Sequence, residues 1–445
     1  MTSVTYVEQQ LQRILEERAN RIAREVGCIV RQRKFSGADV VQMLMFGFGQ
    51  HPHASLEQLA STAAVRGVSV SDTAVHDRFT EPTARLLHRL LEEVSEVVVQ
   101  AAQAVPLSLL KRFGAVICED SSTITLPDEL AELWQGCGGT QAHTAAAVKV
   151  HTRWDLTRGR LWGPKLTAGR TADRRSPLCE QALPPGSLYI ADLGYFSLAR
   201  FVERRAAGSY TLSRLQGRTA LSTPEGEALL LDCLLPKQVG QFKEVSVLVG
   251  ASQRHPMRLF LLRVPKAVGD KRRQALREDA RRRGQPISEE MLYLADWTIL
   301  VTDAPSHLLR LEEALVLLRE RWQMELLYKL WKQQAQIDEW HTRDPWRKLC
   351  ELYAKLLAVT LQHWLIVLFA WHDPQRSLVK LAQVCRDTAW TLMAALAGGR
   401  SLRSALRLIQ RRMQSGCRMN TRRKHPNSAQ LVEAQAVEWA LSWCE

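Results

Sequence analysis

The sequence predicts a mixed α/β fold in which helical regions enclose a β-rich centre, and three patterns lead to that prediction. Apolar residues recur at three- and four-residue steps through residues 1–110 and again from His307 onward, which is the spacing of amphipathic helices. Residues 115–215 hold short β-prone runs separated by turns. Residues 218–305 alternate strand-like pieces with irregular chain. The length of 445 residues allows about two to four domains, at roughly 100–200 residues each.

The N-terminal region contains a segment with the shape of a helix-turn-helix. Ser55 is placed to cap one short helix, Gly67 suits a tight turn, and Ser71 or Asp72 is placed to cap the next helix. Helix, tight turn and helix together are compatible with a DNA-binding motif. A plain helical bundle explains the same pattern, so both interpretations stay open from these residues alone.

The central part is predicted to form a mixed sheet with helical connections. A helical stretch at 171–183 and a second one, SLARFVERRAA, separate the later strands from the earlier ones. Within the irregular part that follows, residues 271–284 are predicted to form a basic helix between strand-like pieces. The five β-prone runs of the core are AVICEDSSTITLP (115–127), TAAAVKVHTRWDLT (144–157), RLWGPKLTAG (160–169), SLYIADLGYF (187–196) and SYTLSRL (209–215).

The charge balance favours a polyanionic partner. The chain has 60 Lys and Arg against 46 Asp and Glu, a formal net charge of +14, which attracts nucleic acid first and an anionic membrane surface second. The most apolar stretch, Leu356 to Trp371, is short for a bilayer span and is interrupted by Gln362 and His363, so a buried helix explains it better. The N-terminal residues lack the apolar core of a secretory signal. We therefore predict a soluble cytosolic chain.

Several classes of chemistry are disfavoured because their motifs are missing. The nine cysteines form no Cys-x-x-Cys pair, which indicates reduced intracellular thiols rather than a zinc site or a disulfide framework. The sequence contains no Gly-x-x-x-x-Gly-Lys-Ser/Thr loop, no Gly-x-Ser-x-Gly elbow and no His-Glu-x-x-His pair. An energy-coupled nucleotide hydrolase, an α/β-hydrolase and a zinc hydrolase are therefore not favoured.

The segment 318–334 places one acid between cations. On a single α-helix, Leu318, Arg321, Glu325 and Lys332 would follow one another by three, four and seven residues and so share one face. A carboxylate flanked by two cations is suited to holding a metal ion beside a phosphate. A salt-bridged amphipathic helix is the alternative interpretation of this segment.

Two further acids end apolar strands. Asp120 follows the run Ala115 to Cys118, and Asp192 follows Leu188–Ala191. Acids at such positions are unexpected in a simple core, because burying an unpaired carboxylate is costly. Three converging carboxylates can hold two Mg²⁺ ions about 3.5–4 Å apart, and that pair activates a water or a 3′-hydroxyl for in-line displacement at phosphorus.

Taken together, these residues resemble those of a known family. The chain is similar to the DDE-type bacterial insertion-sequence transposases of the insertion sequence four family, whose signature is Tyr-x2-Arg-x3-Glu-x6-Lys. Arg321, Glu325 and Lys332 match this signature in residue and spacing, whereas Leu318 stands at the tyrosine position. The resemblance covers about residues 50 to 425. It includes Asp120-Ser121, the phrase DLGYF, Trp322 and the phrase DPWRKLCELYAKLLAVTLQHWL (344–365).

The resemblance implies a ribonuclease H-like α/β catalytic core interrupted by a β-rich insertion. The catalytic acids and metal ligands would be Asp120, Asp192 and Glu325, holding two Mg²⁺ ions for which Mn²⁺ can substitute. Arg321 and Lys332 would hold phosphates near the scissile bond. The implied domains are a helical N-terminal DNA-binding domain (1–110), the first part of the core (111–217), the insertion (218–305), the helix carrying the catalytic glutamate (306–340), and a helical C-terminal region with a basic tail (341–445).

Further DNA-contacting residues follow from the resemblance and from charge. Trp297 is at the position of a family tryptophan that receives a flipped base, and a core position in the insertion sheet is the alternative. Arg214 resembles a DNA-facing arginine of the family, and a surface salt bridge is the alternative. The segment 400–425 holds nine Lys or Arg and no acid, with Arg403, Arg407 and Arg411 on one helical face. We expect this segment and the basic helix 271–284 to contact phosphates, with a solvated basic surface as the alternative.

The predicted function is cut-and-paste transposition of an insertion sequence. The protein would bind terminal inverted repeats, cleave and join DNA by a two-metal-ion mechanism, and work as a homodimer in a DNA synaptic complex. Its partners would be the repeats and the target duplex, with no membrane, in the bacterial cytoplasm at the nucleoid. The alternatives are an impaired or repurposed DNA-binding relative, which Leu318 mildly favours because leucine forms no hydrogen bond, and a nuclease of the same fold that does not join strands.

Overall fold

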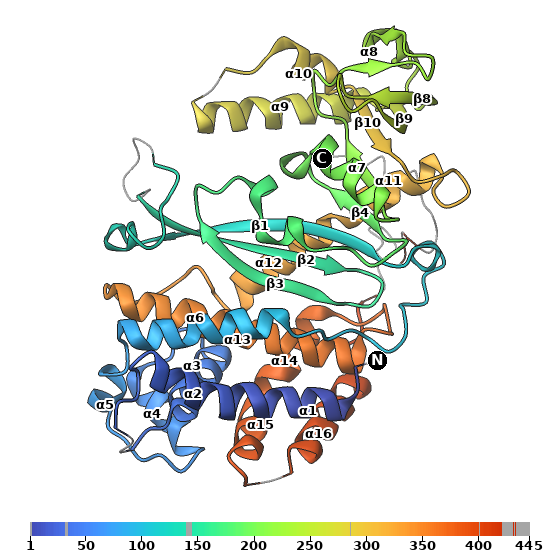
Figure 1. Ribbon diagram of the computed structural model, residues 1–445. Helices are drawn as coiled ribbons and strands as arrows, with labels where there is room; N and C mark the ends of the chain where they lie inside the picture. The colour runs from blue at the N-terminus through green and yellow to red at the C-terminus, as the bar shows by residue number, and fades with distance from the viewer. Residues whose placement is uncertain are drawn as a thin grey trace. The chain divides into compact units, whose positions relative to one another are not determined.

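The computed structural model describes residues 2–31, 34–138, 145–284, 286–399 and 401–420, together with Gln430 and Val432 (Figure 1). The chain forms two compact units. The first, here called the helical unit, comprises Met1–Pro106, Asp120–Glu180 and Met324–Asn420. Among the described residues, the second, here called the sheet unit, comprises Leu107–Glu119 and Gln181–Gln323.

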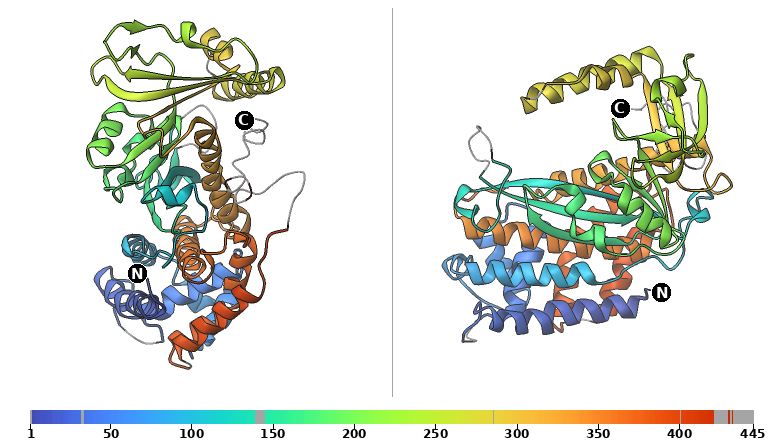
Figure 2. Two further views of the ribbon diagram at one scale, coloured as in Figure 1. Left: turned by 90° about the vertical axis from the view of Figure 1, so that its right-hand side faces the viewer. Right: turned by 45° about the horizontal axis from the view of Figure 1, so that its top comes forward.

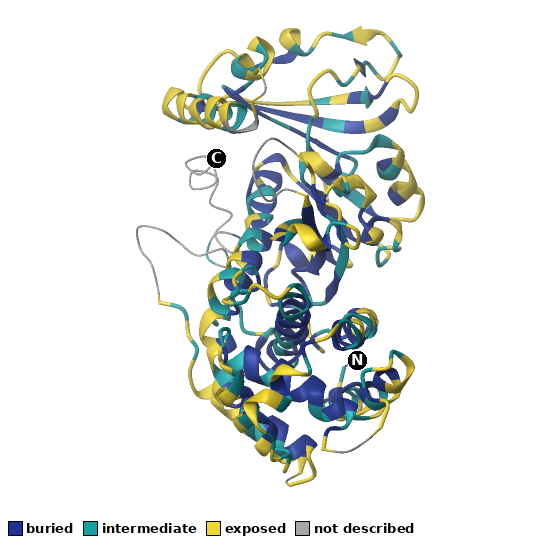
Figure 3. Ribbon diagram, turned by 90° about the vertical axis from the view of Figure 1, so that its left-hand side faces the viewer, coloured by how far each residue is buried: buried dark blue, intermediate teal, exposed yellow. Residues whose placement is uncertain are grey.

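The helical unit is organised around one long apolar helix, α13 (Pro345–Ala370). Helices α3 (Gly37–Gln50) and α6 (Glu81–Glu96) pack along it, and α6 also contacts strand β3 (Leu161–Ala168). Helices α3, α6 and α13 lie on one side of β2 and β3 (Figure 2), and α13 is coloured as buried along most of its length (Figure 3). The remaining α-helices are α1 (Val4–Gln12), α2 (Ala19–Glu25), α4 (Leu56–Ala64), α5 (Asp72–His76), most of α12 (Trp322–Gln334), α14 (Leu378–Asp387), α15 (Ala389–Leu396) and α16 (Leu402–Ser415), with a π-helical turn at Arg13–Arg18.

Helix α13 is longer than the apolar stretch 356–371 from which it was expected. It spans 26 residues, with a mean hydropathy of 1.6 over its most apolar window, so by length and composition it could cross a membrane. However, 83% of that window is buried inside the protein, as in the core helix of a globular domain. The expectation of a buried helix is therefore supported, although the helix begins 11 residues before the apolar stretch from which it was predicted.

The helix-turn-helix-like segment has the caps that its sequence predicts. The Ser55 hydroxyl accepts a hydrogen bond from the Gln58 backbone N–H at 3.1 Å and begins α4. Gly67 has a φ of +78°, a value that glycine adopts without strain, and it lies in the turn. The Ser71 hydroxyl accepts from the Ala74 N–H at 3.3 Å, so Ser71 is the cap of α5 and Asp72 is its first residue.

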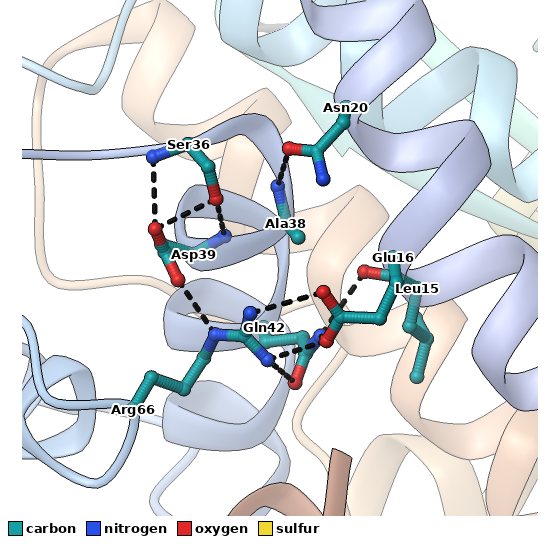
Figure 4. A network of polar contacts seen from close by, with 8 residues as sticks. All are labelled: Leu15, Glu16, Asn20, Ser36, Ala38, Asp39, Gln42 and Arg66. Atoms are coloured by element: carbon teal, nitrogen blue, oxygen red, sulfur yellow. Dashed lines mark hydrogen bonds and ion pairs between the residues drawn. The ribbon is translucent and has the colours of Figure 1, made fainter. Parts of the chain in front are cut away.

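Arg66, in the turn after α4, joins this segment to the preceding helices (Figure 4). Its Nε donates to Asp39 at 2.7 Å, and its Nη atoms donate to Glu16 at 2.6 and 3.1 Å and to Gln42 at 2.8 Å. The Arg66 side chain is only 8% exposed. Burial alone would raise the pKa of Asp39, but hydrogen bonds from Ser36 and Arg66 lower it overall. The carboxylate is thus held ionised beside a buried cation.

The strands of the helical unit are the second part of β1 (Val116–Leu126), β2 (Ala146–Asp155) and β3. Strands β2 and β3 pair antiparallel, with a register shift between His151 and Arg153. Their connecting turn is fastened to α13, because His363 Nε2 lies 2.7 Å from the Gly159 carbonyl oxygen. Burial lowers the pKa of His363 to about 4, so the ring is neutral at pH 7 and can donate one N–H to that carbonyl.

The sheet unit contains three parallel strands that begin with the first part of β1. Strand β4 (Leu188–Ala191) pairs with β1 and with β5 (Tyr210–Arg214), and both pairings are parallel. Helix α7 (Leu198–Ala206) makes the crossover from β4 to β5. The ten strands are hydrogen-bonded in the order β3-β2-β1-β4-β5-β10-β9-β8-β6-β7. The mixed α/β class with a ribonuclease H-like core is thereby confirmed.

Residues 218–305 extend this sheet by antiparallel strands. Strand β10 (Trp297–Thr302) pairs with β5 on one side and with β9 (His255–Arg263) on the other. The other elements are β6 (Leu221–Ser222), β7 (Ala228–Leu229), α8 (Leu231–Leu234), β8 (Phe242–Val249), α9 (Lys266–Arg283) and α10 (Glu289–Leu294), followed by α11 (Leu311–Glu320). The compact units cut across the five predicted domains, whose boundaries stay a prediction.

Candidate active site

Asp120 lies in the middle of β1, so the prediction that this acid ends a strand was wrong, because the strand continues to Leu126. Glu119 is the last residue of β1 in the sheet unit, and Asp120 is its first residue in the helical unit. Its side chain is half-buried, and its Oδ1 accepts a hydrogen bond from the Ser121 backbone N–H at 2.8 Å. Two residues earlier, Cys118 pairs in register with Ile190 of β4. The buried apolar residues Val116, Ile117 and Cys118 therefore fix the strand that presents Asp120.

Asp192 directly follows β4 and stands two residues after Ile190, as Asp120 stands two residues after Cys118. Its side chain is 42% exposed. The Arg321 Nε lies 3.8 Å from Asp192 Oδ1, which is a long ion pair between two residues of the sheet unit. The structure thus brings together one predicted acid and one predicted phosphate-binding cation.

The segment expected to form one helix over 318–334 is divided into two. Helix α11 ends at Glu320, and α12 (Trp322–Gln334) begins two residues later. The Arg321 N–H bonds the Leu318 carbonyl at 3.3 Å, a three-residue spacing that closes the end of α11. The prediction of a single continuous helix was therefore wrong, and the four signature residues do not share one unbroken helix.

Glu325 lies in the first turn of α12 and is half-buried. One turn further on, Tyr328 anchors the helix to the strands of the same unit. The Tyr328 Oη lies 3.0 Å from the Asp120 carbonyl oxygen and 2.9 Å from that of Val150, and it accepts from the Thr152 hydroxyl at 2.8 Å. A phenol has one proton, so it donates to one carbonyl at a time. Sequence reasoning missed Tyr328, although its position three residues after Glu325 places both on neighbouring helix positions.

Lys332 lies near the end of α12 and is paired within the helical unit. Its Nζ is 3.4 Å from Asp338 Oδ2, and both side chains are about one-third exposed. Leu318, on α11 in the sheet unit, is half-buried. Asp120 and Glu325 belong to the helical unit and Asp192 to the sheet unit, so the convergence of all three stays a prediction. Within either unit, the described residues contain no group of three or more His, Cys, Asp or Glu side chains that could hold a metal ion.

Trp297 is a buried residue of the sheet unit. It is 8% exposed, its indole N–H donates to the Pro236 carbonyl at 2.9 Å, and its ring contacts Tyr293 with centroids 4.9 Å apart. The Arg263 guanidinium lies 5.1 Å from the ring centre. These contacts favour the alternative in which Trp297 packs in the core of the insertion.

The other predicted DNA-contacting residues lie on well-formed elements. Arg214 is half-buried at the end of β5, in register with Leu300 of β10. On α16, Arg407 and Arg411 are exposed, whereas Arg403 pairs with Glu8 of α1 at 3.1 Å. Arg400 and residues 421–425 of the basic segment lie outside the described residues.

The basic helix predicted at 271–284 corresponds to α9, and part of its charge is used within the protein. Arg272 donates to the carbonyls of Ala295 and Trp297 at 3.3 and 3.0 Å, and Arg273 pairs with Asp296 at 2.7 Å. These two arginines fasten the helix to the segment before β10. Arg277 and Arg281 are exposed.

Comparison with known proteins shows that the chain is similar in sequence to transposases. A model of the transposase DDE domain family matches residues 111–361. The chain is 27% identical over 378 residues to the transposase for insertion sequence element IS231F of Bacillus thuringiensis subsp. israelensis, covering 80% of this chain and 78% of that one. It is 26% identical over 350 residues to the transposase for IS421 of Escherichia coli, covering 76% and 88%. A piggyBac transposase synaptic complex with hairpin DNA aligns over 95% of this chain and 87% of that one, with 9% identity and a TM-score of 0.44.

Proposed function

Since the chain belongs to the transposase DDE domain family, we propose that it moves an insertion sequence by cut-and-paste transposition. The protein is a DDE-type transposase of the insertion sequence four family and acts on DNA as a polynucleotidyl transferase. The observation that carries the proposal is the register of β1 and β4. Cys118 and Ile190 are partners in parallel strands, and each is followed after one residue by an acid, Asp120 or Asp192. In this proposal, equal offsets from paired residues of parallel strands would direct both carboxylates to the same face of the sheet.

The third acid, Glu325, joins this pair through the position of α12 in the proposal. Tyr328, one turn after Glu325, bonds the backbone of Asp120 itself. A link from α12 to the residue that carries the first acid supports a role for Glu325 beside Asp120. The acceptors of the Tyr328 hydroxyl are backbone carbonyls, whose positions do not depend on side-chain rotamers. They would therefore hold α12 in a fixed position beside Asp120.

The chemistry of the three acids fits divalent metal ions. Carboxylate oxygens are the ligands that Mg²⁺ prefers, with Mn²⁺ able to replace it. Asp192 is 42% exposed and its ion pair with Arg321 is long, at 3.8 Å. Its carboxylate can therefore bind a metal ion without breaking a short ion pair with Arg321. When bound, two such ions would supply Lewis-acid activation of a water or 3′-hydroxyl and stabilisation of the leaving oxygen.

The cations beside the acids would position the DNA. In this proposal, Arg321 leaves Asp192 and donates to a phosphate near the scissile bond, because a planar guanidinium binds phosphate with two hydrogen bonds. Lys332 would exchange Asp338 for a second phosphate in the same way. The two pairs thus keep the cations ordered until DNA replaces their partners.

Recognition of the terminal inverted repeats is assigned to the N-terminal helices. The capped helices α4 and α5 and the buried Arg66 give that segment a fixed shape, which a DNA-binding motif needs. We propose that two copies pair on two DNA ends in a synaptic complex, in the bacterial cytoplasm at the nucleoid. Leu318 favours a second candidate, an impaired DNA-binding relative, since it cannot hydrogen-bond a phosphate near the site.

A plasmid assay tests the proposal. The substrate carries a marker between the inverted repeats found beside the coding region, and purified protein is added with Mg²⁺. We expect excision and insertion by the wild type. Asp120→Asn should abolish cleavage and leave binding to the repeats within about twofold, because the neutral amide is a poor metal ligand. Asp232→Asn, the same change at an exposed acid of α8, is the matched control and should act like the wild type.

Three outcomes of this assay separate the candidates. Nicking without joining would indicate a nuclease, and binding without nicking would indicate the impaired relative. If Asp120→Asn lost repeat binding together with cleavage while remaining folded, the role given to Asp120 would be wrong.

A further inference from the structure

The loop Gly169–Arg175, here called the arginine loop, follows β3 in the helical unit. It contains Arg170, Arg174 and Arg175 within six residues, and all three are exposed. Across the described residues, none of these three side chains forms an ion pair or a side-chain hydrogen bond. By contrast, Arg66, Arg272 and Arg403 are all engaged by acids or carbonyls. The guanidinium groups of the arginine loop are therefore exposed to solvent and, among the described residues, are not used in ion pairs or side-chain hydrogen bonds.

The backbone of the arginine loop is fastened at its start. The Gly169 N–H donates to the Ala147 carbonyl at 2.7 Å. A Cβ at Gly169 would lie 2.5 Å from the Ala147 Cβ, so only glycine fits this close approach to β2. Two residues on, the Thr171 carbonyl accepts from Lys149 Nζ at 2.7 Å. The loop is thus held against β2 at two points.

Asp173 fastens the loop's other half and links it to the candidate active site. Its Oδ1 accepts from Lys149 Nζ at 3.1 Å and from the Ser121 hydroxyl at 2.7 Å. The N–H of Ser121 in turn donates to the carboxylate of Asp120 at 2.8 Å. Two hydrogen bonds through one residue therefore connect the arginine loop to the first catalytic acid of the proposal.

The charge of the loop is left unbalanced on its exposed side. Asp173 is the acid of the loop, and Lys149 neutralises it from β2. Three positive charges remain on a segment whose backbone is already ordered. Binding an anion to an ordered segment avoids the entropy cost of ordering it at the moment of contact.

We propose that the arginine loop is a binding site for the DNA phosphate backbone, next to the bond that is cut. The inference rests on the proposed function for the identity of the anion and for the closeness of the cut. Arginine is the side chain best suited to phosphate, because its fork donates two parallel hydrogen bonds. Asp173 and Ser121 act as positioning residues that fix the distance from the bound backbone to Asp120.

The salt dependence of DNA binding tests the proposal. The probe is a duplex that carries one terminal repeat and a few base pairs of flanking DNA, and the dissociation constant is measured at several salt concentrations. Each phosphate contact contributes about −0.9 to the slope of log K against log salt. The triple variant R170A/R174A/R175A should therefore lower the magnitude of the slope by about 2.7. The control K111A/K237A/K243A removes the same charge at exposed lysines of the sheet unit and should change the slope by less than about one.

Two further results separate this inference from the function on which it rests. Lysine at all three positions should restore most of the slope, because the charge returns. An unchanged slope in the triple alanine variant, with an unchanged melting temperature, would overturn the inference even if Asp120→Asn abolished cleavage. A reduced slope alongside cleavage by Asp120→Asn would instead retain the DNA site and reject the proposed role of Asp120.

Discussion

The two compact units hold their proposed catalytic acids in different ways. In the helical unit, the helix that carries Glu325 is fastened by the Tyr328 hydroxyl to the backbone carbonyls of Asp120 and Val150. In the sheet unit, Asp192 is 42% exposed and meets Arg321 across 3.8 Å. The first arrangement fixes backbone positions, whereas the second leaves side chains able to exchange partners. Under the proposed function, a fixed helix and side chains that can exchange partners are suited to binding metal ions and DNA phosphates.

The largest expected effect on the free energy of unfolding comes from removing the Tyr328 hydroxyl. Tyr328→Phe deletes a buried donor to one backbone carbonyl and the acceptor of the Thr152 hydroxyl, so the free energy of unfolding should fall by about 1–3 kcal/mol. Chemical denaturation measures this change. Tyr293→Phe, at a tyrosine that is 49% exposed, is the control and should shift the free energy of unfolding by less than about 0.5 kcal/mol. Equal stability of the two variants would show that the Tyr328 hydrogen bonds do not hold α12.

In the sheet unit, the effect on stability is expected to be smaller, and the change should appear in DNA cleavage. Arg321→Gln removes the proposed charge-assisted contact to phosphate, worth about 1.5–3 kcal/mol, so DNA cleavage should slow roughly 10- to 100-fold. The free energy of unfolding should change less than in Tyr328→Phe, since the ion pair of Arg321 with Asp192 is long and partly exposed. Arg321→Lys should recover only part of the rate, because an ammonium group does not form two parallel bonds. A loss of stability as large as that of Tyr328→Phe would contradict the proposed difference between the Tyr328 contacts of the helical unit and the Arg321–Asp192 ion pair of the sheet unit.

The smallest effect concerns the departure from the family signature. Leu318→Tyr adds a hydroxyl at a half-buried position of α11, and one neutral hydrogen bond to a phosphate is worth about 0.5–1.5 kcal/mol. Cleavage should therefore quicken by about two- to tenfold in the plasmid assay. The variant Leu318→Phe supplies the ring without the hydroxyl and should give no gain. A gain shared by both variants would point to packing instead of hydrogen bonding.

Local signals in the sequence predicted the frame of the fold well. The caps Ser55 and Ser71, the strand that carries Asp120, the strand that ends before Asp192, and the helical ends of the chain all depend on residues close together in the sequence. Such short-range patterns are visible without a structure.

What the sequence did not reveal depends on long-range contacts or on small changes of geometry. Tyr328 bonds a residue 208 positions away, and no local spacing marks that partnership. The break between α11 and α12 occurs among good helix formers, so propensity predicted one helix where a tight turn at Arg321 makes two. Trp297 begins a strand as expected, but its burial and its bond to Pro236 depend on the fold of the insertion.

The buried Arg66 has a consequence for how such a protein can diversify. Its guanidinium bonds Glu16, Asp39 and Gln42, all of which precede the turn, and among the described contacts it does not touch α5. The residues that fix the turn before α5 are therefore different from the residues exposed on α5. Under the proposed function, substitutions on the exposed face of α5 would change the nucleotides that it prefers without disturbing the hydrogen bonds of Arg66.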